Sequence, residues 1–152
     1  MHWLRLAAPG ALLLFSAMAC SESSAPLPPG AIQQRAEQLR WQPGPAALPP
    51  GVELVVLEGD PKKEALFTMR LKVPAGTRLP PHTHPRDERV TVLSGKVGIG
   101  FGENFEDKAL RFVESGGYYV NPAGVVHFVL FAEDSVVQIT TFGPWIVKPV
   151  AQ

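Results

Sequence analysis

Two histidines and an acid near the middle of the chain have the types and spacing of metal ligands. His82 and His84 are separated by one residue, and Glu88 follows in the same segment, HTHPRDER. On an extended strand alternate side chains point to one face, so both imidazoles can reach the same ion. Pro85 favours a kink that can return the carboxylate to that side. Two imidazoles and one carboxylate suit iron, manganese and similar divalent ions.

His127 is a further candidate, and its surroundings allow two interpretations. It begins the strongly apolar segment HFVLF, where a histidine can be a core residue hydrogen-bonded to backbone. Pro122 and Gly124 precede it and favour a tight turn that fixes where the strand begins. If its ring points inward, His127 adds a third imidazole to the other two.

The segments around these residues predict a chain of short strands. Apolar and polar residues alternate over 66–73, and further short apolar runs are bounded by Gly, Pro, Asn or Asp. The expected strands cover 52–57, 66–73, 89–93, 96–101, 110–113, 118–120, 125–131 and 135–142. Ser94-Gly95 between two of them predicts a hairpin. The pattern is typical of an all-β protein, an antiparallel barrel or jelly roll, with no helix after residue 50.

Composition agrees with one exported β domain and excludes a nucleic-acid partner. The chain has 152 residues, 45% hydrophobic and 18% charged, which suits a single core. Gly (14) and Pro (16) are abundant enough for many tight turns. The formal net charge is zero and no run of like charges occurs, so we expect no nucleic acid among the partners.

The first twenty residues predict export. A basic start, a short apolar stretch and small residues before Cys20 have the layout of a secretory signal. Cys20 is the only cysteine, so no intramolecular disulfide can form. The cysteine resembles the lipidated residue of bacterial lipoproteins, although Ala17 stands where leucine is usual, and plain cleavage after Ala19 is the alternative. Ser21 resembles an outer-membrane sorting signal, so we expect a periplasmic lipoprotein whose only membrane contact is its lipid anchor.

Three segments are expected along the chain. Residues 1–19 form the signal peptide, 20–50 a tether and lead-in rich in proline and small residues, and 51–147 the β domain. Within the lead-in, 31–41 has helical composition and can form a helix of two to three turns.

The histidine segments resemble the two motifs of the cupins. The spacing between the residues of both motifs matches this sequence, and the resemblance covers roughly residues 50–147. The first is matched by Gly76, His82, His84, Glu88 and Gly95, and the second by Gly116, Pro122, Gly124 and His127. Phe131 stands where the second motif has asparagine, a position that is not a metal ligand in the family. The resemblance implies a cupin-type double-stranded β-helix, that is, a jelly-roll barrel.

The same resemblance implies a ligand set and leaves the reaction open. His82, His84, Glu88 and His127 would hold a divalent transition metal, iron, manganese, nickel, copper or zinc, with two positions left for other ligands. One function is a dioxygenase-like oxidoreductase on a small organic substrate, in which Glu88 can act as a base. The alternatives are a non-catalytic cupin binding a small ligand or metal in the cell envelope, and a metal-dependent isomerase or hydrolase. A homodimer is the expected assembly.

Several other residues carry weaker expectations. Alternation predicts that a set of apolar residues lines the barrel: Phe67, Met69, Val97, Ile99, Phe101, Val129 and Ile139. Either Tyr118 or Tyr119 can face the pocket as a polar group, and the pattern does not choose between them. Arg86 and Arg89 are expected to be solvated at the barrel mouth, and Trp145 to pack where the segment FGPWIVKP covers the barrel.

Overall fold

A computed structural model describes residues 25–150. The chain separates into two units, 1–31 and 32–152, and the fold described below is that of the second unit. Among residues 25–150 no helix has the length and apolar character that crossing a membrane requires. The expected signal peptide and Cys20 lie outside the described residues.

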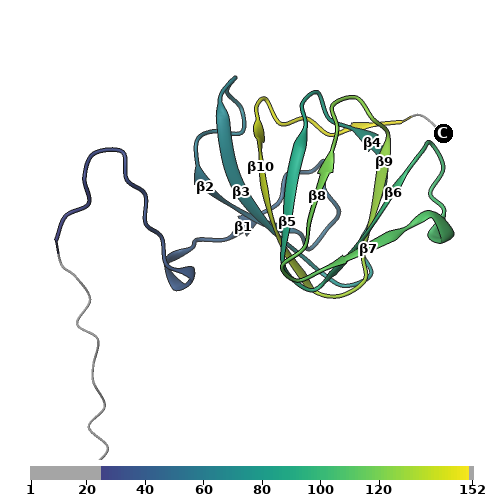
Figure 1. Cartoon of the computed structure of the whole chain (residues 1–152), viewed down its shortest axis with the longest axis horizontal. Helices are drawn as coiled ribbons and strands as arrows, with labels where there is room; N and C mark the ends of the chain where they lie inside the picture. Colours follow the sequence, from purple (N-terminus) through teal and green to yellow (C-terminus); the bar gives the residue numbers. More distant parts are fainter. Residues whose placement is uncertain (1–24, 151–152) are drawn as a thin grey trace, which may run out of the picture. The chain divides into compact units, whose positions relative to one another are not determined.

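Two antiparallel sheets form the fold (Figure 1). In spatial order the six-stranded sheet contains β1 (Gln42–Pro43), β2 (Glu53–Glu58), β3 (Leu66–Val73), β10 (Ser135–Phe142), β5 (Glu88–Ser94) and β8 (Tyr118–Asn121). The five-stranded sheet contains β11 (Lys148–Pro149), β4 (Arg78–Thr83), β9 (His127–Phe131), β6 (Lys96–Phe101) and β7 (Arg111–Glu114). This is a jelly roll, so the predicted fold class is confirmed.

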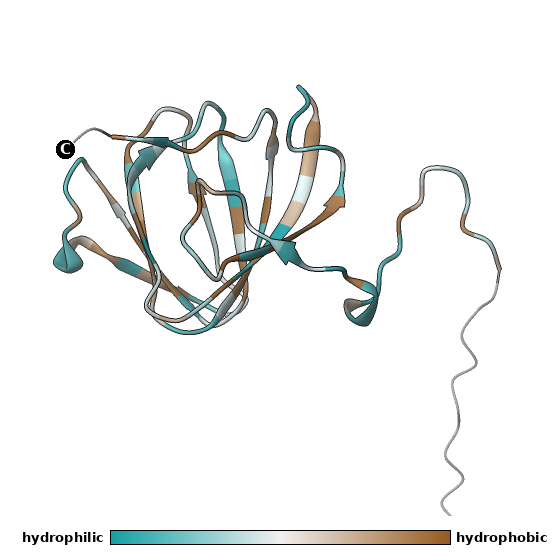
Figure 2. Cartoon of the chain, turned by 180° about the vertical axis from the view of Figure 1, so that it is seen from behind, coloured by the Kyte–Doolittle hydropathy of each residue, from teal (hydrophilic) through white to brown (hydrophobic). Residues whose placement is uncertain are grey.

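Side chains of alternate residues from both sheets fill the space between them. On β3, Phe67 and Met69 are fully buried, while the intervening Thr68 bonds to Thr140 of β10 across the outer face. Hydrophobic and hydrophilic residues alternate along the strands in Figure 2, as expected when each strand has one buried face. Replacing a fully buried Phe67 by alanine would cost about 3–5 kcal/mol, so this core supplies much of the stability.

The sequence pattern located eight of the strands in the described residues and missed the other three. It did not identify β1, β4 or β11. Pro80 and Pro81 lie inside β4, and proline lowers the strand signal of any segment because it cannot donate to a ladder. The helix expected over 31–41 is only a 3-10 turn, η1 (Ala36–Gln38), none of whose residues is buried, so no packing extends it. A second short turn, η2 (Asp107–Ala109), lies where no helix was expected.

The predicted hairpin at Ser94-Gly95 is wrong. Strands β5 and β6 belong to different sheets, so the chain crosses from one sheet to the other at Gly95. Gly95 has a φ of 82°, which favours glycine, and a Cβ there would collide with Ser135 Oγ. The glycine is therefore required by the crossing rather than by a two-residue hairpin.

Candidate metal centre

Strand pairing brings two of the candidate histidines together. His82 on β4 is the register partner of His127 on β9, and their ring centroids are 4.3 Å apart. His84 follows immediately after β4, with its ring 5.0 Å from that of His82 and 5.2 Å from that of His127. One ring nitrogen from each of the three lies within 4.8 Å of the others. His127 therefore points inward, toward the other two.

Glu88 joins this cluster from the opposite sheet. It is the first residue of β5 and lies on the same buried face as Val90 and Val92. Its Oε2 atom is 3.5 Å from His84 Nε2. All four candidate residues are buried, with exposed fractions of 5% or less. The structure thus brings together the four residues that the sequence singled out as ligands.

Backbone carbonyls fix which nitrogen of each histidine carries the proton. The Nδ1 atoms of His82, His84 and His127 lie 2.7, 2.9 and 3.0 Å from the carbonyl oxygens of Pro80, Ile146 and Val125 respectively. A carbonyl can only accept, so each Nδ1 donates and each neutral ring keeps its lone pair on Nε2. This is the usual arrangement of histidines that bind a metal through Nε2, because the second nitrogen is held by an outer acceptor.

The donor atoms left over fit a cation. His127 Nε2 is buried and has no hydrogen-bond partner among the described residues. His84 Nε2 lies 3.5 Å from Glu88 Oε2, so a cation bound between the two atoms could be held by both. Three imidazole nitrogens and one carboxylate oxygen are a ligand set for divalent transition metals. A metal of that class therefore fits the residues present.

Burial keeps two of the histidines ready for such an ion. Removal from water, and secondarily the neighbouring His127, lowers the pKa of His82 from 6.5 to about 4. Burial is also the main cause that lowers the pKa of His127. Both rings are neutral at pH 7, which is the protonation state that binds metal.

Two side chains that the sequence did not single out as site residues hold the carboxylate. Asn121 Nδ2 donates to Glu88 Oε2 at 3.0 Å, and Trp145 Nε1 donates to Glu88 Oε1 at 3.0 Å. Asn121 is the register partner of Glu88 on β8, whereas Trp145 comes from the C-terminal segment and stacks on His84 at an interplanar angle of 13°. We expected Trp145 only to pack, so its hydrogen bond is a finding of the structure.

A small chamber lies beside the ligands. Its volume is about 30 Å³, and Leu48, Tyr119, Phe131 and Trp145 are among its lining residues. Tyr119 is thus the tyrosine that faces the interior, while Tyr118 is 56% exposed. Burial, and secondarily the charge of Glu88, raises the pKa of the Tyr119 hydroxyl, which stays protonated at neutral pH.

The other sequence expectations mostly agree with the structure. Arg86 and Arg89 are exposed, and Arg89 pairs with Asp87 at 3.3 Å. Six of the seven residues expected to line the barrel are buried. The exception is Phe101, the last residue of β6, which is 51% exposed.

Comparison with known families identifies the fold family. A model described as the ChrR cupin-like domain matches residues 30–146, most of the chain and all four candidate ligands. The chain belongs to this cupin family. The match begins inside the segment that we assigned to the lead-in, and the boundaries of that segment stay a prediction.

Curated relatives match part of this cupin. It is 34% identical to germin-like protein 3-1 of Oryza sativa subsp. japonica over 67 residues, which are 43% of this chain and 30% of that protein. It is 38% identical to the rhicadhesin receptor of Pisum sativum over 60 residues, 39% of this chain and 28% of that protein. The chain therefore spans less than a third of the length of these relatives.

Solved structures share the fold at low sequence identity. An acetylacetone dioxygenase from Acinetobacter johnsonii superposes with a TM-score of 0.60 and 18% identity, covering 88% of this chain and 89% of that one. KdgF from Halomonas sp. gives a TM-score of 0.55 and 19% identity, with 78% and 93% covered. At this identity the likeness concerns the fold alone.

Proposed function

We propose that this cupin binds one divalent transition metal through His82, His84, His127 and Glu88 and acts as a dioxygenase-type oxidoreductase on a small organic molecule. The observation that carries the proposal is the set of three Nε2 lone pairs beside a buried carboxylate, with every Nδ1 proton held by a carbonyl. Such a cluster has no role in core packing, because burying these polar atoms without a cation is costly.

The chain's own residues have distinct parts in such a reaction. A bound metal would supply redox and Lewis-acid chemistry in the chamber. The three histidines would hold it, and the Glu88 carboxylate can serve as the fourth ligand or accept a proton from a substrate. The apolar walls of the chamber exclude water from the reacting groups. The shared fold of the acetylacetone dioxygenase supports this class of reaction by analogy only.

Metal analysis and dioxygen uptake test the proposal. We expect about one equivalent of iron, manganese, nickel, copper or zinc per chain in the full-length protein, and none in a His82→Ala, His84→Ala double variant. Dioxygen consumption with a panel of small organic acids and diketones should require the metal and be lost in Glu88→Gln. A protein that takes up no metal even after reconstitution would refute the proposal.

One observation favours the non-catalytic alternative. The chamber of about 30 Å³ has room for roughly one water molecule, so it admits no organic substrate without rearrangement. A cupin that captures a metal or a very small ligand would need no more space. Stoichiometric metal together with no dioxygen uptake across the panel would favour this function.

We also propose that the protein is exported, and that Cys20 carries the lipid anchor. The support is the signal-like start and the single cysteine after small residues. In a bacterial host, labelled palmitate should enter the parent protein and not a Cys20→Ser variant. Incorporation into neither would favour plain cleavage after Ala19. Assembly as a homodimer is a further proposal, which sedimentation equilibrium would test.

A further inference from the structure

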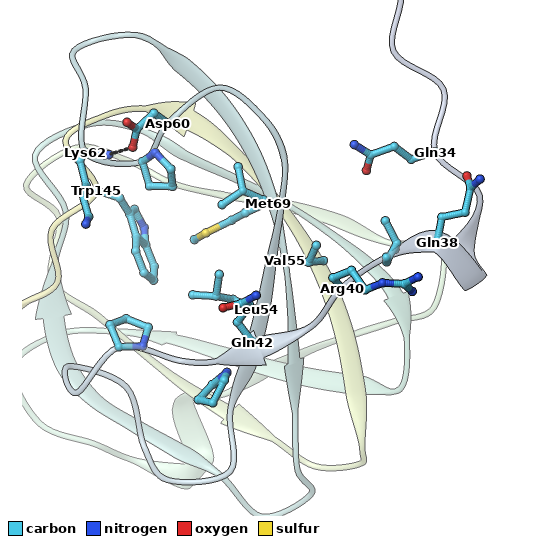
Figure 3. Close-up of a pocket in the computed structure, with 15 residues that line it drawn as sticks. Gln34, Gln38, Arg40, Gln42, Leu54, Val55, Asp60, Lys62, Met69 and Trp145 are labelled. Carbon is cyan, nitrogen blue, oxygen red and sulfur yellow. Dashed lines mark hydrogen bonds between the residues drawn. The ribbon is translucent and has the colours of Figure 1, made fainter.

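A second cavity, much larger than the chamber, lies next to it. Its volume is about 870 Å³, within the range of about 300–1,000 Å³ typical of small-molecule sites. The segment 34–45, strand β2 and the turn 60–62 form its walls, together with Met69 and Trp145 (Figure 3). We call this cavity the outer groove.

Trp145 separates the outer groove from the candidate metal ligands. It lines both cavities, while its indole N–H donates to Glu88 and its ring stacks on His84. Its backbone N–H donates to the Pro61 carbonyl at 2.7 Å, which ties it to the turn that walls the groove. Residues 145–147 belong to no helix or strand, and rotation of the Trp145 side chain would break its hydrogen bond to Glu88. One side chain thus stands between the groove and the chamber.

The lining of the outer groove defines the chemistry of a ligand. Most of the wall is apolar, including Leu54, Val56, Met69 and the indole of Trp145. The charged lining residues are Arg40, Lys62 and Asp60, two cations and one acid. Lys62 and Asp60 lie at the Trp145 end of the groove, where the Lys62 backbone N–H donates to Asp60 Oδ1 at 2.9 Å, and Arg40 lies at the other end (Figure 3). No ion pair within the described residues occupies Lys62.

We propose that the outer groove binds a small organic anion with an apolar body, such as a medium-chain carboxylate, and that Trp145 is the gate between it and the metal ligands. The apolar wall receives the body of the ligand, and Lys62 attracts its negative head beside the indole. Displacing the indole releases Glu88 Oε1 and enlarges a chamber that otherwise has room for about one water. Delivery of a substrate to the metal rests on the proposed function, whereas binding in the groove does not.

The test uses Trp145 as its own reporter. In a full-length Trp3→Phe, Trp41→Phe protein, Trp145 is the sole tryptophan, since the chain has three. Octanoate is added stepwise; calorimetry measures its binding, and the fluorescence emission of Trp145 reports movement of the gate. Octanamide, which has the same apolar chain without the charge, is the neutral control. We expect saturable octanoate binding, a shift of Trp145 emission with the same midpoint, and at least tenfold weaker binding of octanamide.

A matched pair of charge reversals locates the site. Lys62 lines the groove and its exposed neighbour Lys63 does not, so Lys62→Glu and Lys63→Glu make the same change of charge at adjacent positions. We expect Lys62→Glu to raise the octanoate Kd at least tenfold and Lys63→Glu to leave it within twofold of the parent. Absence of saturable binding, or equal effects of the two variants, would overturn the groove site. Binding without an emission change would overturn the gate.

Metal content keeps this outcome separate from the proposed function. The titrations are run on metal-stripped and metal-loaded protein, and the groove predicts octanoate binding in both. Octanoate binding by a protein that takes up no metal would refute the metal site and leave the groove standing. Stoichiometric metal without octanoate binding would refute the groove site and leave the metal site standing.

Discussion

The buried histidines make the stability of the metal-free protein depend on pH, over a pH range set by His82. Burial lowers its pKa in the folded state to about 4, against 6.5 when it is exposed to water. Between these two values the unfolded chain binds a proton that the folded chain does not. Stability is therefore highest above pH 6.5 and falls as the pH falls toward 4.

The size of the effect follows from the two pKa values. One pKa unit corresponds to about 1.4 kcal/mol, so His82 alone removes about 2 kcal/mol of unfolding free energy at pH 5 and about 3 kcal/mol at pH 4, relative to pH 7.5. This loss is a large fraction of the about 5–15 kcal/mol that a domain usually has. Bound metal should raise the unfolding free energy but should not abolish this loss, because the proton is taken up by the unfolded chain and a ligated ring in the folded protein stays unprotonated.

Urea unfolding of chelator-stripped protein measures this effect directly. The parent and a His82→Gln variant are compared at pH 7.5, 6.5, 5.5 and 5, so that carboxylates titrating in both proteins cancel in the difference. We expect the variant to lose about 2 kcal/mol less than the parent between pH 7.5 and 5. Equal pH dependence in the two proteins would refute the claim that His82 is held neutral by burial.

Three further predictions concern the ligands, the residue that holds Glu88, and the motif glycines. His127→Ala should reduce bound metal to less than a tenth of an equivalent while the fold persists, measured by elemental analysis and circular dichroism; full metal content would contradict its place in the ligand set. Trp145→Phe keeps an aromatic ring at this position and removes the N–H donor to Glu88. It should weaken metal affinity about tenfold, measured by competition with a chelator, whereas the control Trp41→Phe should leave the affinity unchanged. Gly95→Ala should lower the unfolding free energy, measured in urea, by at least about 2 kcal/mol, and by more than Gly76→Ala does. Both glycines have a positive φ, but only Gly95 has no space for a Cβ. Equal losses in the two variants would contradict this steric explanation.

The parts of this fold visible in the sequence are those specified by neighbours along the chain. The alternation over 66–73 located β3 with its bounds, because one face of that strand is buried throughout. The two-residue spacing of His82 and His84 likewise placed both rings on one side. Strand β11 has only two residues, and its pairing with β4 leaves no periodic signal that a reader of the sequence could detect.

The support of Glu88 could not be predicted, because it is non-local. Asn121 and Trp145 lie 33 and 57 residues further along the chain than the carboxylate they hold. The sequence did contain a hint of the position of Asn121: it lies two residues after the inward-facing Tyr119 on the same strand, so both side chains point to the same face. Nothing comparable marked Trp145, whose segment belongs to no regular element and is placed by contacts with the turn at Pro61.

Contacts from residues 145–149 also set the order in which the ligand cluster can be completed during synthesis. The carbonyl of Ile146 orients His84, the indole of Trp145 holds Glu88, and β11 pairs with β4 beside His82. Before residues 145–149 are made, the nascent chain has all its ligating side chains but lacks the groups that orient His84 and hold Glu88 Oε1. Tight metal uptake must then wait until residues 145–149 have joined the fold. The ion that this cupin acquires is accordingly drawn from the metal pool of the compartment in which that last step of folding takes place.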